Sequence, residues 1–171
     1  YVNMALSYMR LGSETTDFVL RQTDLDEVIR MAVRRYARHF ISKKIVLHYE
    51  ETGARVLTDE KWLGFVLGQI LSNALKYTKK GKISIYMSKS RPHTLVIEDT
   101  GIGIRAEDLP RVFEKGFTGY NGREENRSTG IGLYLCGKIM KRLDHGIRIE
   151  SELGKGTKVF LELERKKMDL Y

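Results

Sequence analysis

The chain has 171 residues, which suits one ordinary domain and a piece of another. Apolar residues make up 42% and charged residues 30%, a normal balance for a globular protein. The formal net charge of +8 is compatible with a nucleic acid or a membrane surface as partner. Because Lys and Arg are scattered along the sequence, a solvated basic surface is the simpler interpretation, and we expect no direct contact with nucleic acid.

The single cysteine, Cys136, lies between apolar residues in "GLYLCGKIM", which predicts a buried core thiol. Without a CxxC pair, a disulfide framework and a cysteine zinc site are excluded. No apolar run approaches the ~18–20 residues of a membrane span, and no signal peptide is visible. The sequence begins inside a helical pattern, "YVNMALSYMRLG", so we interpret it as a fragment that leaves room for a membrane segment upstream.

The first half of the chain predicts helices alternating with short strands. Residues 1–11 have the apolar stripe of a helix end, and residues 17–25 form an extended segment. A helix capped by Thr23 or Asp24 runs to about Phe40, and a strand follows in "KIVLHYEE". Thr58 is the expected N-cap of a helix over about residues 60–77, which is apolar on most sides and therefore central.

The second half predicts mainly strands. "KKGKISIYMSKS" and "HTLVIEDT" are two strands, "TGIGLYLCGKIMKRL" is a helix, and "GIRIESELGKGTKVFLELE" is a closing hairpin that turns at residues 154–156. The predicted fold class is α/β: a two-layer sandwich of a mixed β-sheet with about three helices on one face.

The segment "LVIEDTGIGI" ends an apolar strand at Asp99 and continues directly into Gly101 and Gly103. Glycine lets backbone approach a ligand closely, and a carboxylate at a strand end suits a donor such as an exocyclic amine. A tight turn with an Asx hydrogen bond is the alternative. The glycines also match the dinucleotide fingerprint, but Pro110 follows too soon for the helix that this fingerprint requires. The "GKGT" sequence lacks Walker A spacing and is better explained as a hairpin turn.

Two further segments have features of a phosphate site. In "STGIGL", Gly130 and Gly132 open a helix whose N-terminal N–H groups can bind phosphate. A flexible hinge leading into the helix is the alternative, and the two interpretations are compatible with each other. In "QILSNALKYT", Gln69, Asn73 and Tyr77 are spaced four apart and share a helix face. An amide oxygen suits Mg²⁺, and a lysine one turn on can meet the same phosphates. A solvent-facing helix edge remains the alternative.

In this order, "NALKY", "DTGIGI" and "STGIGL" resemble the N box and the two glycine boxes of the GHKL ATPase superfamily, whose members share the Bergerat fold. "VFEKGF" resembles the F box of sensor histidine kinases, and the variant "FEKGFTGYNGR…STGIGLYL" looks most like BceS-type intramembrane-sensing kinases. The resemblance covers roughly residues 17–164.

The resemblance implies ATP and Mg²⁺ as cofactors and assigns roles by position. Asn73 would hold Mg²⁺, Lys76 would meet phosphate, and Asp99 would accept from the adenine amino group. The implied catalytic residues are Gln69, Asn73 and Lys76. The implied nucleotide-binding residues are Asn73, Lys76, Tyr77, Asp99, Gly101, Gly103, Ile104, Phe113, Gly130, Gly132, Leu133 and Thr157.

The resemblance also implies a domain plan. Residues 1–14 would be the end of the dimerisation and phosphoacceptor helix, and residues 15–171 the catalytic ATP-binding domain with an ATP lid at about 105–129. Three features depart from the family pattern: Gln69 stands where many members have Asn, Ser128 replaces a glycine, and the F box has an extra residue without the usual following arginine. Arg123 or Arg127 could replace that arginine.

The resemblance implies a protein-histidine kinase whose phosphoacceptor lies elsewhere, because none of the four histidines is followed by an acidic residue. The implied partners are its own dimerisation domain, a response regulator and, for a full-length homodimer in the cell membrane, an ABC transporter. This chain would be a cytoplasmic domain of that protein. A nucleotide-driven clamp module and a catalytically inactive scaffold are the alternatives. "VFEKGF" argues against the first, and intact "NALKY" and "DTGIG" argue against the second.

Overall fold

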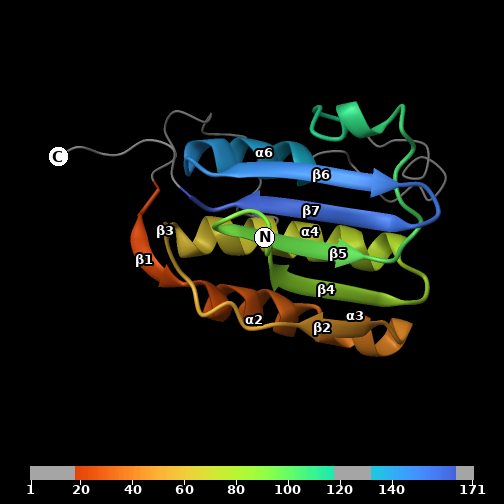
Figure 1. Ribbon diagram of the computed structural model, residues 1–171, viewed down its shortest axis with the longest axis horizontal. Coiled ribbons are helices and arrows are strands. Elements are labelled where there is room, and N and C mark those ends of the chain that lie inside the picture. Colours follow the sequence, from red (N-terminus) through yellow and green to blue (C-terminus); the bar gives the residue numbers. More distant parts are fainter. Residues whose placement is uncertain (1–17, 118–131, 165–171) are drawn as a thin grey trace.

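The computed structural model describes residues 18–117 and 132–164. Its main layer is a five-stranded sheet in the order β2-β4-β5-β7-β6 (Figure 1). The strands are β2 (Val46–Tyr49), β4 (Lys82–Met87), β5 (Thr94–Asp99), β7 (Gly156–Glu162) and β6 (Gly146–Glu152). Because β2 pairs with β4 in parallel and the other neighbours are antiparallel, the sheet is mixed, as predicted.

The second layer consists of helices on one face of this sheet, so the predicted two-layer α/β class is confirmed (Figure 1). They are α2 (Leu25–Arg35), α3 (Ala37–Lys43), α4 (Glu60–Tyr77) and α6 (Gly132–Arg142), with a short 3-10 helix η1 (Leu109–Arg111) beside the sheet edge. A separate two-stranded sheet pairs β1 (Arg21–Asp24) with β3 (Arg55–Thr58). No helix in the described ranges is long and apolar enough to cross a membrane.

The single helix expected up to Phe40 is wrong, because the chain forms two helices that meet at Tyr36. Asp24 caps the first by accepting a hydrogen bond from the backbone N–H of Asp26 at 3.0 Å. Tyr36 has φ −102° and ψ 8°, outside helical geometry, and its N–H bonds to Val33 three residues back. The bend lets Phe40, 7% exposed, join the same core as the first helix.

Helix α4 has the predicted bounds but not the predicted cap. Asp59, rather than Thr58, accepts the backbone N–H of Trp62 at 3.1 Å. The Thr58 hydroxyl instead lies 3.0 Å from Nε2 of buried His145. Ten residues of α4 are buried, which confirms it as the central helix of the core. The core thiol prediction also holds: Cys136 is 0% exposed, and burial raises its pKa to about 12.

The end of α4 and the end of β5 meet at one edge of the sheet. The backbone N–H of Ile102, just after β5, donates to the Tyr77 carbonyl at 3.1 Å. In the β5–β7 ladder, Asp99 is paired with Thr157. Three segments far apart in sequence therefore converge where the first glycine cluster lies.

Candidate nucleotide-binding site

Asp99 is the charged group at the centre of this convergence. Burial raises the pKa of its carboxyl to about 6. Backbone hydrogen bonds from Gly101 and Thr157 act in the opposite direction and lower the pKa, while the neighbouring Glu98 charge raises it further. One carboxylate oxygen, Oδ1, accepts the Gly101 N–H at 2.9 Å, which is the Asx-type bond considered as the alternative. The turn and a ligand site are compatible, because a carboxylate has further lone pairs to offer.

The two glycines after Asp99 are required by space. A Cβ on Gly101 would lie 2.5 Å from the Tyr77 carbonyl oxygen, 2.8 Å from Oγ1 of Thr78 and 2.9 Å from Oδ1 of Asp99. A Cβ on Gly103 would lie 2.2 Å from the Glu152 carbonyl oxygen, and its φ of +76° also favours glycine. Residues 101–108 form no helix, so the dinucleotide-fingerprint alternative fails.

The β6–β7 hairpin closes the other side of this segment through the expected site residue Thr157 and through Ser151 and Gly156, to which the sequence assigned no ligand role. Ser151 accepts the Ile104 N–H at 2.8 Å, and its hydroxyl lies 2.8 Å from Oγ1 of Thr157 and 2.9 Å from the Gly156 carbonyl oxygen. A Cβ on Gly156 would lie 2.1 Å from the Asp99 carbonyl oxygen. Only the strand register reveals these roles, since "GKGT" by itself predicts no more than a turn.

The polar strip of α4 borders the same region. Gln69, Asn73, Lys76 and Tyr77 are all half-buried. The Lys76 ammonium lies 5.3 Å from the Tyr77 ring centroid. Next to them Thr78 is fully buried, and no partner of its hydroxyl is found among the described residues.

Gln69 faces the start of α6. Its side-chain oxygen would lie 2.6 Å from a Cβ on Gly132, so a larger residue where the second glycine box enters the helix would displace this amide. Leu133 follows and is half-buried. This contact gives Gln69 a packing role at the expected phosphate end. Gly130 lies outside the described residues.

The expected ATP lid is described up to residue 117; residues 118–129 lie outside the described ranges. Val112 is 9% exposed, and Phe113 packs on α6, where its ring carbon lies 3.6 Å from the place of a Cβ on Gly137. Lys115 lies 6.0 Å from the ring centroid of Tyr134 on α6. The F-box segment is thus fixed to the helix that begins at the second glycine box.

The residues at this site can bind Mg²⁺ only together with other ligands, namely waters and phosphate oxygens. Among residues 18–117 and 132–164, no group of three or more His, Cys, Asp or Glu is placed to hold a metal ion. The Asn73 amide offers one hard oxygen from a half-buried position beside Lys76. Mg²⁺ usually keeps several waters and shares phosphate oxygens with one or two protein ligands, so this donor set fits a nucleotide-bound ion.

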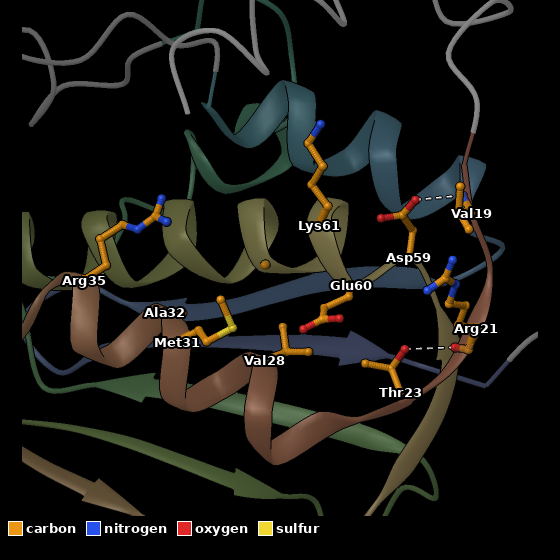
Figure 2. A pocket seen from close by; sticks show the side chains of 11 residues that line it. Val19, Arg21, Thr23, Val28, Met31, Ala32, Arg35, Asp59, Glu60 and Lys61 are labelled. Carbon is orange, nitrogen blue, oxygen red and sulfur yellow. Dashed lines mark hydrogen bonds between the residues drawn. The ribbon is translucent and has the colours of Figure 1, made fainter.

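A hollow of about 560 Å³ lies elsewhere, between α2, β1 and the start of α4 (Figure 2). It is lined by Val19, Arg21, Thr23, Val28, Met31, Ala32, Arg35, Asp59, Glu60, Lys61 and Gly64. Gly64 precedes Asn73 by nine residues, or about 14 Å along the helix axis. None of the sequence-predicted site residues lines this hollow.

A carboxylate and bare glycine backbone lie together at the edge of an α/β sandwich, which is the arrangement that the sequence predicted for a nucleotide-binding module. The chain belongs to the family of histidine kinase-, DNA gyrase B- and HSP90-like ATPases, whose model matches residues 58–167. The resemblance to sensor histidine kinases found in the sequence is therefore confirmed.

Relatives include the sensor histidine kinase YxdK of Bacillus subtilis, 34% identical over 158 residues, which are 88% of this chain and 47% of that protein. The sensor histidine kinase GraS of Staphylococcus haemolyticus is 41% identical over 152 residues, 86% of this chain and 44% of that protein. The chain thus spans less than half the length of these relatives.

Solved structures show the same fold. Full-length ShkA, crystallised with AMPPNP, has a TM-score of 0.79 at 22% identity, covering 95% of this chain and 34% of ShkA. The nucleotide-free catalytic domain of the histidine kinase ThkA has a TM-score of 0.71 at 23% identity, covering 86% of this chain and 99% of that domain.

Proposed function

We propose that this chain is the ATP-binding catalytic part of a sensor histidine kinase, which transfers the γ-phosphoryl group of ATP to a histidine outside this chain. The convergence of Asp99, Gly101 and Thr157 with the polar end of α4 supports this proposal most directly. This arrangement places the Asp99 carboxylate, which can bind the adenine base, near the Asn73 amide and the Lys76 ammonium, which can bind the phosphates. The membership of the family and the sensor kinase relatives support the same reaction.

In this mechanism the chain mainly positions its substrate. Asp99 accepts a hydrogen bond from the adenine amino group, while the close backbone at Gly101 and Gly103 excludes water from the base. Lys76 offsets phosphate charge, and the Asn73 amide oxygen would hold Mg²⁺ beside the phosphates. When bound, Mg²⁺ supplies charge neutralisation at the phosphate oxygens. Phosphoryl transfer depends on such positioning and charge stabilisation more than on covalent participation of the protein.

The remaining parts of the proposal concern the whole protein. Residues 1–14 continue the dimerisation and phosphoacceptor domain, residues 15–171 are the catalytic domain, and its lid spans about residues 105–129. The partners are that phosphoacceptor domain, a cognate response regulator and an ABC transporter. The full-length kinase is a homodimer in the cell membrane, with this domain in the cytoplasm. The relatives, which include BceS sensor proteins, support the role as a sensor kinase, while the transporter, the dimer and the membrane setting rest on the resemblance to BceS-type kinases.

Calorimetric titration with a non-hydrolysable ATP analogue, with and without Mg²⁺, tests the proposal. We expect Mg²⁺-dependent binding by the wild-type chain and an altered Mg²⁺ dependence in Asn73→Asp, since the added charge changes the ion's ligand set. Ser72→Asp is the matched control, because it adds the same charge one residue away on another side of the helix. A folded chain that binds no nucleotide would favour the inactive scaffold instead.

A further inference from the structure

The charges of this chain are segregated to an unusual degree once the fold is considered. Residues 28–49 contain six Lys or Arg, residues 61–97 contain seven, and neither stretch contains an Asp or Glu. These basic residues look scattered in sequence. The parallel pairing of β2 with β4 joins the two acid-free stretches side by side.

The junction of these stretches is a compact corner of the molecule. Lys44 ends α3 in a left-handed conformation, and its N–H donates to the Ile41 carbonyl at 3.2 Å. Val46, two residues on, donates its N–H to the Gly81 carbonyl at 3.1 Å and is paired with Lys82. The turn after α3 therefore lies against the turn before β4, and Figure 1 shows α3 and β2 together along one edge of the sheet.

We call this corner the basic patch and define it by five cations and two aliphatic residues: Arg38, Ile41, Lys44, Val46, Lys79, Lys80 and Lys82. All seven are exposed, and the aliphatic side chains are strongly so, at 76% for Ile41 and 55% for Val46. None of the five cations forms an ion pair with another residue of the described ranges.

The surrounding acidic groups are occupied or turned elsewhere. Glu50 and Glu51 lie beyond the opposite end of β2 from the turn at Lys44, and Glu51 pairs with Arg30 at 2.9 Å. Glu98 accepts from the Tyr86 hydroxyl and lies 3.7 Å from the Lys158 ammonium. Asp99, the acid nearest in strand register, belongs to the nucleotide site. The positive charge of the basic patch is therefore left for a partner.

We infer that the basic patch docks this domain on an anionic membrane surface. Lysine is depleted in protein–protein interfaces, which favour aromatic residues and arginine, and four of the five cations here are lysines. Clustered lysines around exposed aliphatic side chains instead match a lipid interface, where cations meet headgroups and aliphatic groups enter the acyl boundary. A flat bilayer also needs no cavity, and no residue of the basic patch lines the hollow between α2, β1 and α4.

Docking here would orient the nucleotide site. Lys43, between the patch and the core, donates from its ammonium to the Leu75 carbonyl near the end of α4. The Lys82 N–H donates to Oγ1 of Thr100 at 3.0 Å, between Asp99 and Gly101. The basic patch therefore lies beside the base end of the site, so membrane contact would hold that end close to the lipid surface. This inference does not depend on phosphoryl transfer.

Vesicle binding by the complete chain tests the inference. We expect it to co-sediment with mixed phosphatidylglycerol–phosphatidylcholine vesicles and not with phosphatidylcholine alone, with binding that weakens as salt is added. The triple variant Lys44→Gln/Lys79→Gln/Lys80→Gln should bind about a hundredfold more weakly, because each lysine near an anionic surface contributes roughly fivefold. Ile41→Ser should lose about fivefold, because a side chain that enters the acyl boundary is lost.

The matched control is Lys61→Gln/Lys89→Gln/Lys141→Gln, which removes three exposed lysines outside the basic patch. Both triple variants carry a formal charge of +5, three below the wild-type +8. The control should retain most of the affinity. Equal losses in both triple variants, or no vesicle binding by the wild type, would overturn the inference. Retention of the wild type on immobilised polyglutamate without vesicle binding would assign the patch to an acidic protein instead. Nucleotide titration of the same variants should match the wild type, which separates this test from that of the kinase proposal.

Discussion

The two ends of α4 differ in what they offer a ligand. At its start lies an open hollow of about 560 Å³, lined by side chains that point in from α2, β1 and α4 (Figure 2). At its end the backbone of Gly101 lies so close to Tyr77 and Asp99 that a Cβ would not fit. Volume alone would direct attention to the start of the helix. The buried carboxylate and the enforced glycines direct it to the end, because perturbed titratable groups and constrained backbone are concentrated at functional sites.

The strongest test of this contrast exchanges one carboxylate for an amide at each end of α4. Asp99→Asn should weaken binding of a non-hydrolysable ATP analogue by about 10- to 150-fold. The new amide can still accept the Gly101 N–H but presents a donor to the adenine amine, and a charge-assisted hydrogen bond of roughly 1.5–3 kcal/mol is lost. Calorimetric titration measures the affinity, and circular dichroism checks the fold.

Asp59→Asn is the control for this exchange, because Asp59 lines the hollow and its substitution makes the same change in charge as Asp99→Asn. Asn caps helices as well as Asp does, but the second carboxylate oxygen of Asp59 also accepts the Val19 N–H at 2.8 Å. Asp59→Asn should therefore lower the unfolding free energy by about 1 kcal/mol and leave nucleotide affinity near the wild-type value. Unchanged affinity in Asp99→Asn, or an equal loss in Asp59→Asn, would contradict the assignment of the base site to the end of α4.

A second test adds one methyl group at each end. Gly101→Ala places a Cβ 2.5 Å from the Tyr77 carbonyl oxygen, which is backbone and cannot move aside cheaply. We expect a loss of about 1–3 kcal/mol in unfolding free energy and about a tenfold loss in nucleotide affinity. Chemical denaturation and calorimetry measure the two quantities.

Gly64→Ala is the counterpart at the hollow. Outside its own helix, only the Val28 side chain among the described residues would lie within 4 Å of the new Cβ, at 3.9 Å, and the alanine replaces a glycine inside a helix. Alanine there should stabilise the fold by about 0.5–1 kcal/mol and leave affinity unchanged. If Gly101→Ala and Gly64→Ala changed the free energy of unfolding by the same amount, the close packing at Gly101 would not restrict which residue the fold accepts there.

Much of the fold could be predicted because it depends on local patterns. The bounds of α4 follow from its apolar periodicity and from the polar turn after Tyr77, and the end of β5 follows from the change of an apolar run into "EDTGIG". The cap of α4 could not be chosen this way. Thr58 and Asp59 are both good caps, and the contact of Thr58 with His145, 87 residues away, decides between them.

The candidate site shows the same division. Asp99 and its glycines are visible as a motif, whereas Ser151 and Gly156 acquire their roles only through the pairing of β5, β6 and β7. The basic patch is the clearest case, because its lysines belong to two stretches that are unremarkable in sequence and adjacent only in the sheet. Local physics therefore predicts elements and motifs, while strand register determines which side chains share a surface.

The last test uses pH to sharpen the distinction between the two ends, and it rests on the pKa of Asp99, raised by burial from 3.8 to about 6. The fold favours the neutral carboxyl of Asp99. Its contribution to the free energy of unfolding is therefore fully present below the pKa of the unfolded chain and is lost as the pH rises through about 6. Base binding has the opposite dependence, since the adenine amine needs an ionised acceptor. Affinity for adenosine, which has no phosphate to titrate, should therefore be about tenfold lower at pH 5 than at pH 7 and nearly constant above pH 7. Calorimetry at each pH measures it, with unfolding followed under the same conditions to show that the chain stays folded. A flat profile between pH 5 and pH 7 would mean that Asp99 is not the base acceptor.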